Sequence, residues 1–331
     1  MKKKYLLELG GENAELGKFE ALELLTTKKY EPELILDKGK IIALDVASDI
    51  SKEIIRRLGM TRRISEIIHY LPERKIKHVL RNVPDIEIGD KSFAIRVIDG
   101  KKEGEGLISK KLGSKISAKN KIDLVNPDVK ILYYSRESTI IAIWKKYNDT
   151  YYSKCLKHHV KHRPYFSPIS IHPRIARAMV NFSNCTSKNS IIDPFCGTGG
   201  ILIEIADMKI RAIGIDILKK MVEYSNGNLK HYKLEAEIME GDIEQLLNYD
   251  FEGIVTDPPY GISTTTKGED LKHLMKRSMN IFSRALVTGQ RIVIAVSNPK
   301  VIKNPDFKVL YKFEWYIHKT LTKYIFVLEK S

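Results

Sequence analysis

The four residues Asp257-Pro258-Pro259-Tyr260 combine side chains and backbone geometry that could grip a planar amine. They follow a short apolar run, residues 253–256, which indicates a buried parallel strand because it is too short for a helix. Each proline keeps the residue before it extended and cannot donate to a strand ladder, so the strand ends here. The Asp257 carboxylate and the Pro258 carbonyl then remain as acceptors for an exocyclic NH2 group, and Tyr260 can lie against the ring that bears it. A plain tight turn is the alternative, and the upstream sequence has to decide between the two.

Acidic residues also lie at the ends of three predicted strands upstream. The first strand runs into Asp193-Pro-Phe-Cys-Gly-Thr-Gly199, where glycines let a ligand approach the start of a helix. Asp216 ends the second strand, at the position that binds ribose hydroxyls in nucleotide-binding folds, and Asp242 follows the third. With Asp257 they place four carboxylates in one crevice, which would repel a pyrophosphate but accept a cationic sulfonium. The pattern therefore favours S-adenosylmethionine over NAD as cofactor.

The C-terminal half alternates strands and helices at regular spacing. Strands are predicted at 190–193, 211–216, 237–240, 253–257 and 291–296, and helices at 199–208, 217–231 and 269–287. Two late strands, 307–316 and 320–328, are separated by so few residues that they must pair antiparallel. Five parallel strands followed by such a hairpin are typical of the class I, Rossmann-like methyltransferase fold, an α/β domain with a seven-stranded mixed sheet.

The first 148 residues contain shorter α+β patterns. Residues 1–50 are predicted to form a small domain, with strands at 5–9, 33–36 and 40–44 and a helix at 16–25. Residues 51–148 are predicted to form a second one, with a short helix near Ile54, strands at 92–97, 129–134 and 139–144, and a basic helical stretch at 109–116. The lysines of that stretch and just beyond it could neutralise phosphates, although a solvated helix face explains the same spacing: Lys110, Lys111, Lys115 and Lys119.

Composition limits the class of protein. The chain has 331 residues and a net charge of +15, which favours a polyanionic partner, nucleic acid before membrane; a lysine-rich proteome is the alternative. Three cysteines without a CxxC pair fit a reducing compartment, so we expect a cytoplasmic protein. No apolar run approaches the ~18 residues of a membrane span, and Glu8 and Glu12 interrupt any signal peptide.

Residues 149–165 are predicted to link these domains to a catalytic domain at 166–331. Side chains that could bind zinc are grouped in this stretch: Cys155, His158, His159 and His162. They are crowded locally among lysines that would repel a cation, so we expect no metal site. We predict instead a basic segment that faces RNA and includes Arg163, followed by a helix from Pro173 to Phe182.

These motifs resemble those of known families. Asp193-Pro-Phe-Cys-Gly-Thr-Gly199 and Asp257-Pro-Pro-Tyr-Gly261 resemble the amino-methyltransferases that act on exocyclic nitrogens of nucleic-acid bases. The basic helix and Asp123-Leu-Val-Asn-Pro-Asp128 resemble a THUMP domain, which binds the acceptor end of tRNA, preceded by a ferredoxin-like domain. With Arg163-Pro164, the whole chain resembles the archaeal tRNA (guanine-N2) methyltransferases that modify guanosine 10. A sister family that modifies guanosine 6 usually has Asn in place of Asp257, which favours guanosine 10.

The resemblance implies roles for the candidate residues. It implies that the cofactor contacts Asp193, Phe195, Gly197, Gly199, Asp216, Ile217, Asp242 and Ile243. Asp216 would bind the ribose hydroxyls and Asp242 the adenine amine. Asp257 and the Pro258 carbonyl would aim the guanine N2 amine at the methyl group, and Tyr260 would stack on a base turned out of its helix. The expected product is mono- or dimethylated guanosine 10 of tRNA, made by a monomeric enzyme.

Other functions fit parts of the pattern. A DNA amino-methyltransferase shares the Asp-Pro-Pro-Tyr motif but does not need the N-terminal half, and a protein glutamine methyltransferase leaves that basic half unused. A tRNA methyltransferase acting on another guanosine, such as guanosine 6, also remains open. A non-catalytic RNA-binding protein with a relict cofactor fold would not need the intact glycines and the acidic strand ends.

Overall fold

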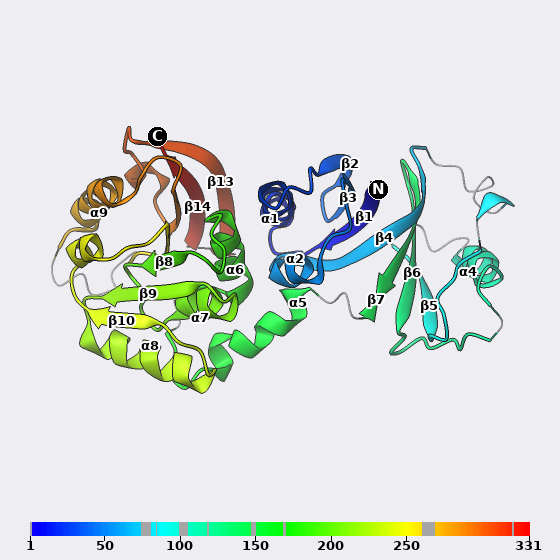
Figure 1. The fold of residues 1–331 in the computed structure, drawn as a ribbon, viewed down its shortest axis with the longest axis horizontal. Coiled ribbons are helices and arrows are strands. Elements are labelled where there is room, and N and C mark those ends of the chain that lie inside the picture. Colours follow the sequence, from blue (N-terminus) through cyan, green and yellow to red (C-terminus); the bar gives the residue numbers. More distant parts are fainter. Residues whose placement is uncertain are drawn as a thin grey trace. The chain divides into compact units, whose positions relative to one another are not determined.

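The computed structural model describes residues 2–73, 81–83, 85–98, 105–117, 119–146, 150–167, 170–259, 269–319 and 321–331. The chain forms two compact units, each built on a seven-stranded sheet (Figure 1). The first unit consists of residues 1–14, 28–56 and 61–150, and the second of residues 15–27, 57–60 and 151–331. We call them the N-terminal unit and the catalytic unit.

The sheet of the N-terminal unit has the strand order β2-β3-β1-β4-β7-β6-β5. Neighbouring strands in this sheet pair antiparallel, except β5 and β6, which pair parallel. The strands are β1 (Lys3–Leu9), β2 (Glu33–Lys38), β3 (Ile41–Val46), β4 (Thr61–Leu71), β5 (Phe93–Val97), β6 (Val129–Ser135) and β7 (Thr139–Lys145). Helix α2 (Lys52–Arg57) precedes β4, and helix α4 (Glu105–Gly113) packs on β5.

The predicted boundary between residues 50 and 51 does not separate two units. Strand β4, which sequence analysis missed, pairs with β1 on one side and with β7 on the other, so residues 1–50 and 51–148 share one sheet. Its residues do not alternate between apolar and polar types, because charged side chains of β4 pair across the sheet: Arg63 with Glu8 and Glu66 with Lys3. Cross-strand ion pairs therefore replace the apolar alternation that would have indicated a strand.

Helix α1 (Ala14–Thr27) belongs to the catalytic unit and not to a domain of residues 1–50. Glu20 of α1 is fully buried, and its two carboxylate oxygens accept hydrogen bonds from the backbone of Gly59 and Met60 at 2.8 Å. The Asn181 side chain donates to the same carboxylate at 2.7 Å. A polar side chain buried in this way is tied down by its partners, so α1 is anchored to the catalytic unit.

The sheet of the catalytic unit has the order β10-β9-β8-β11-β12-β14-β13. The first five strands in this list pair parallel, while β14 pairs antiparallel with both β12 and β13. The strands are β8 (Ser190–Asp193), β9 (Arg211–Asp216), β10 (Glu237–Glu240), β11 (Gly253–Thr256), β12 (Arg291–Val296), β13 (Phe307–His318) and β14 (Leu321–Lys330). This arrangement confirms the predicted class I methyltransferase sheet, and each parallel strand agrees with its prediction to within one residue.

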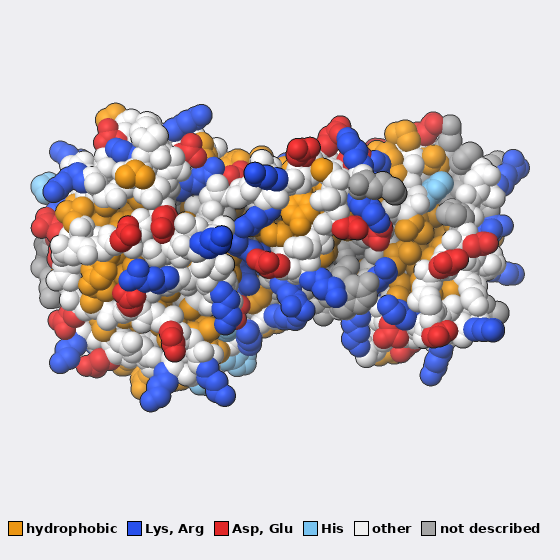
Figure 2. All heavy atoms as spheres, viewed as in Figure 1, with side chains coloured by type: hydrophobic (Ala, Val, Ile, Leu, Met, Phe, Trp, Pro, Cys, Tyr) orange, Lys and Arg blue, Asp and Glu red, His pale blue; other side chains and the backbone are white. Residues whose placement is uncertain are grey.

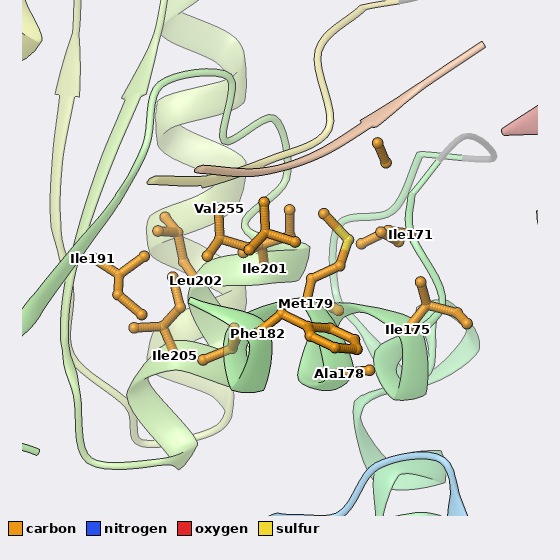
Figure 3. Close-up of a cluster of buried hydrophobic side chains, with 14 of the residues drawn as sticks. Ile171, Ile175, Ala178, Met179, Phe182, Ile191, Ile201, Leu202, Ile205 and Val255 are labelled. Atoms are coloured by element: carbon orange, nitrogen blue, oxygen red, sulfur yellow. The ribbon is translucent and has the colours of Figure 1, made fainter. Parts of the chain in front are cut away.

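Helices cover both faces of this sheet. They are α6 (Pro173–Phe182), α7 (Gly200–Asp207), α8 (Lys219–His231) and α9 (Leu271–Ala285), with short 3-10 helices η4 (Ile243–Asn248) and η5 (Pro299–Val301). Met179 and Phe182 of α6 pack with Ile201 of α7 against one face of the sheet (Figure 3). Met275 and Phe282 of α9 pack against the other face. Strands buried on both faces are continuously apolar, which is why length and flanking residues identified them.

The predicted linker is instead a folded part of the catalytic unit. It forms helix α5 (Tyr151–Lys154) and the 3-10 helices η2 (Cys155–His158) and η3 (Val160–His162). His158 is 1% exposed, and its Nδ1 lies 2.6 Å from the Tyr151 hydroxyl and 2.9 Å from a Glu204 carboxylate oxygen. In the described part of the chain, no group of three His, Cys, Asp or Glu side chains is arranged to hold a metal ion.

Arg163 is also buried, at 5% exposure, so the prediction that its side chain faces RNA is wrong. Its Nε donates to the His158 carbonyl at 2.9 Å, and its guanidinium packs against Gly200 at the start of α7. A Cβ at Gly200 would lie 3.1 Å from a guanidinium nitrogen of Arg163. Arg163 therefore supports the turn that leads into α7 from inside the protein.

Lys and Arg side chains occur over both units on the face shown in Figure 2, among scattered acidic residues. On this face, the Lys and Arg side chains are thus distributed over the surface and not gathered in one patch. Within the described ranges, no helix is both long enough and apolar enough to cross a membrane.

Candidate active site

A cavity of about 360 Å³ opens in the catalytic unit where β8, β9, β10 and β11 end. The predicted site residues that line it are Asp193, Phe195, Gly197, Asp216, Ile217, Asp242, Ile243, Asp257 and Pro258. The carboxyl ends of parallel strands meet at one edge of a sheet, so residues far apart in the sequence converge there. Predicted residue Gly199 is not part of the lining; it is the N-cap of α7.

The glycine turn after β8 is locked to the end of β9. Gly197 and Gly199 have φ of 51° and 80°, in the left-handed region that favours glycine. The backbone N–H of Gly197 donates to one carboxylate oxygen of Asp216 at 2.9 Å, and the N–H of Leu218 donates to the other at 2.9 Å. A Cβ at Gly197 would meet no atom within 4 Å, so the backbone there borders open space that a ligand can occupy.

Asp193 is a buried carboxyl in the floor of the cavity, at 1% exposure. One of its oxygens accepts hydrogen bonds from the Thr256 hydroxyl at 2.7 Å and from the Phe195 backbone at 3.2 Å. Burial raises the pKa of Asp193 to about 7, and the charges of Asp257 and Asp216 add to this effect. A cation placed in the cavity would stabilise the ionised form, so the acidic lining fits a positively charged cofactor.

Asp242 forms an ion pair that sequence analysis did not predict. The Arg277 guanidinium, from α9, donates to its two carboxylate oxygens at 2.6 and 3.0 Å, and also donates to Glu269 at 2.8 Å. Hydrogen bonding to Arg277 is the main reason that the pKa of Asp242 is lowered. A carboxylate has about four lone-pair sites, so Asp242 can still accept from an adenine amine, and this role stays a prediction.

Asp257 is paired with a lysine that lies far away in the sequence. The Lys323 ammonium, from β14, donates to the two carboxylate oxygens of Asp257 at 2.7 and 2.6 Å. The Asp257 side chain is 11% exposed and the Lys323 side chain 1%. Burial raises the pKa of Asp257, and the charge and hydrogen bond of Lys323 oppose that rise. Pro258 lines the cavity beside it, whereas Tyr260 lies outside the described residues.

Further residues contribute that the sequence motifs did not reveal. The Ser170 and Thr198 hydroxyls lie 3.2 Å apart, and both residues line the cavity with Glu269 and Arg277. One feature of the sequence could have indicated Lys323: it is a charged residue on the same face of a strand as the apolar residues Ile325 and Val327, which are buried. No such feature indicated Arg277, because it is one of several basic residues interspersed with apolar residues in helix α9.

The predicted phosphate-binding lysines lie in the N-terminal unit. Lys110 and Lys119 are exposed, Lys111 is half-buried, and Lys115 donates to Asp85 at 3.1 Å. Lys110 and Lys111 lie in the last turn of α4, and the other two follow the helix. Their contact with RNA stays a prediction.

Comparisons with known proteins agree with the fold. Residues 161–308 match a family model described as "RMKL-like, methyltransferase domain". The solved structure of TrmN from Thermus thermophilus is similar in fold, with a TM-score of 0.58, 17% identity, and coverage of 99% of this chain and 100% of that chain.

Two curated relatives are similar over most of their length. Each bears the name tRNA (guanine(10)-N2)-dimethyltransferase. The protein of Pyrococcus abyssi is 32% identical over 84% of this chain and 86% of its own, and that of Methanocaldococcus jannaschii 30% identical over 97% and 98%. With this identity over nearly the whole chain, and with the methyltransferase sheet and acidic cavity described above, the chain belongs to the archaeal tRNA (guanine(10)-N2)-dimethyltransferase family.

Proposed function

We propose that this protein methylates the exocyclic N2 amine of guanosine 10 in tRNA. As a member of its family it is a methyltransferase, and its cofactor is S-adenosylmethionine. The observation that carries the proposal is that Asp257 and Pro258 share one cavity with the glycine turn and the acidic ends of β8, β9 and β10. An amine acceptor and a site suited to a cationic cofactor are thereby brought together.

The residues of the cavity have separate roles in methyl transfer. When bound, S-adenosylmethionine supplies an electrophilic methyl group. The Asp257 carboxylate and the Pro258 carbonyl each accept a hydrogen bond from the amine, which directs the nitrogen lone pair toward that group. Because this nitrogen is conjugated and poorly nucleophilic, orientation and electrostatics supply most of the rate. As the N–C bond forms and the bond from the methyl carbon to sulfur breaks, the amine would become more acidic, and Asp257 would take the proton that it releases.

The test is nucleoside mass spectrometry of an unmodified tRNA transcript incubated with enzyme and S-adenosylmethionine. We expect N2-methylguanosine at position 10, followed by N2,N2-dimethylguanosine if both methyl groups are added. A transcript with adenosine at position 10 is the matched control and should stay unmodified. Methylation of guanosine 6 alone, or of duplex DNA in preference to tRNA, would overturn the proposal.

Cofactor binding should depend on pH through Asp193. Its ordinary pKa of 3.8 is raised to about 7 in the folded protein. Below pH 7 the Asp193 carboxyl is therefore mostly protonated, and it must lose its proton before a cationic ligand can pair with a charged carboxylate. The affinity for S-adenosylhomocysteine, which keeps the cationic amino group, should therefore be about tenfold weaker at pH 6 than at pH 8. Isothermal titration calorimetry measures it, and Asp193→Asn should remove most of the dependence. An equal pH dependence in wild type and Asp193→Asn would refute this role.

The lysines of the N-terminal unit should contribute to tRNA affinity through phosphate contacts. Replacing Lys110, Lys111, Lys115 and Lys119 together by Ala should raise KM for tRNA, leave kcat nearly unchanged and flatten the salt dependence. Each lost phosphate contact removes about 0.7–0.9 from the slope of log K against log salt. The matched control replaces four exposed lysines of the catalytic unit, Lys188, Lys230, Lys300 and Lys308. If both variants change the slope equally, the effect comes from net charge and not from this surface.

A further inference from the structure

Lys323 is a buried charge in a strand that is otherwise apolar on that face. It is 1% exposed, and β14 turns it to the same side as Ile325 and Val327, which are fully buried in the core. Burying an ammonium costs several kcal/mol unless it is paired and hydrogen-bonded. Replacing such a pair by apolar residues is often neutral or stabilising, so stability alone explains this lysine poorly.

The position of Lys323 directs its charge to the residue proposed to hold the substrate amine. Asp257 follows β11, and β12 lies between β11 and β14 in the sheet. The lysine side chain therefore reaches across the end of β12 to place its ammonium 2.7 and 2.6 Å from the two oxygens of Asp257. Contact with both oxygens holds the carboxylate facing the ammonium and favours its charged form.

We propose that Lys323 is a positioning residue for methyl transfer, which orients the Asp257 carboxylate and keeps it in the charged form that accepts a hydrogen bond from the substrate amine. This inference rests on the function proposed above. Two of about four lone-pair sites on the carboxylate face the lysine, so others remain for the amine. A protonated Asp257 would lose acceptor sites and could no longer take the proton released by the amine.

The burial of Asp257 explains why it needs this partner. Burial favours the neutral acid, and the Asp193 carboxyl at the end of β8 is close enough for its pKa to be raised by the charge of Asp257. Asp216, at the end of β9, adds a second carboxyl that acts on Asp193. At Asp257 itself, burial raises the pKa, and the charge and hydrogen bonds of Lys323 oppose that rise. Without it, the carboxyl should titrate at a higher pH.

The variant Lys323→Gln tests this role, because it keeps a hydrogen-bond donor of similar length but removes the charge. We expect kcat for tRNA methylation at pH 7 to fall about 100-fold, with affinity for S-adenosylhomocysteine unchanged within about threefold. The acidic limb of the kcat–pH profile should move to higher pH, so that the deficit shrinks at pH 9. Lys323→Arg should restore both the rate and the position of the limb to within about tenfold and half a pH unit, respectively.

The control is Lys308→Gln, an exposed lysine at the far end of the same hairpin, which should behave like wild type. A Lys323→Gln enzyme with wild-type kcat and an unshifted profile would overturn the role of Lys323 while the proposed function stands. If wild-type protein leaves the tRNA transcript unmodified, the proposed function itself fails. If Lys323→Gln does not fold, Lys323→Arg is the test. An acidic limb of the kcat–pH profile at the wild-type pH supports the role, and a shifted limb or a loss of kcat overturns it.

Discussion

Asp257→Asn is expected to lower kcat for tRNA methylation by about 10²–10³-fold while leaving the affinity for S-adenosylhomocysteine within about threefold of wild type. The amide keeps one oxygen for Lys323 but replaces the other acceptor by a donor, and it removes the negative charge beside the amine. Labelled-methyl incorporation into the transcript and calorimetry measure the two quantities separately. The cofactor readout should hold because the glycine turn and Asp216 bind each other without Asp257.

The matched control for this variant is Asp250→Asn, an exposed carboxylate seven residues earlier in the same unit. It should have no effect on either quantity. Asp257→Ala is a poorer test, because it leaves the Lys323 ammonium buried without this carboxylate, a change that costs about 3–5 kcal/mol of stability. Full activity in Asp257→Asn would show that the carboxylate does not hold the amine.

The second large effect is expected for Gly199→Ala. At a φ of 80° a side chain is strained, and the new Cβ would lie 2.4 Å from the Ser225 hydroxyl oxygen, so the turn into α7 must shift. The left-handed backbone alone costs about 1–2 kcal/mol for a non-glycine residue. Because the same turn carries the Gly197 N–H to Asp216, we expect affinity for S-adenosylhomocysteine to fall at least about tenfold, or 1.4 kcal/mol.

Gly289→Ala separates backbone strain from displacement of the turn. Gly289 has a similar φ of 86°, but a Cβ there would meet nothing within 4 Å. Thermal unfolding should therefore show a loss of stability in both variants, whereas calorimetry should show weaker cofactor binding only in Gly199→Ala. Equal cofactor affinity in the two variants would mean that the geometry of the glycine turn does not determine binding.

The order of the catalytic sheet and most of its cavity could be predicted because both depend on local patterns. The apolar runs of β8, β9, β11 and β12 have the length of buried strands. Each predicted carboxylate is the last residue of its strand, as for Asp193 and Asp216, or follows the strand within two residues, as for Asp257 and Asp242. Parallel topology then brings these ends together without any knowledge of side-chain packing. Asp193, Asp216, Asp242 and Asp257 accordingly line one cavity.

Other predictions failed where a residue's environment comes from distant parts of the chain. Arg163 lies in a run of basic residues, which suggested a surface that faces RNA, but its contacts are the His158 carbonyl and Gly200. Helix α1 was assigned to the first 50 residues by proximity in sequence, whereas Glu20 has its partners at Gly59, Met60 and Asn181. Basic composition and sequence order carry no information about such partners.

By itself, the sequence determined the strands, the glycine turn and the acidic residues at the edge of the sheet, since strand length, glycine and proline act on neighbouring residues. Only the tertiary structure decided which charges are paired. Arg277 reaches Asp242 from α9, and Lys323 reaches Asp257 from β14, 66 residues away. Whether a buried carboxylate keeps its charge depends on such a partner, and the partner's distance is set by how the strands and helices pack.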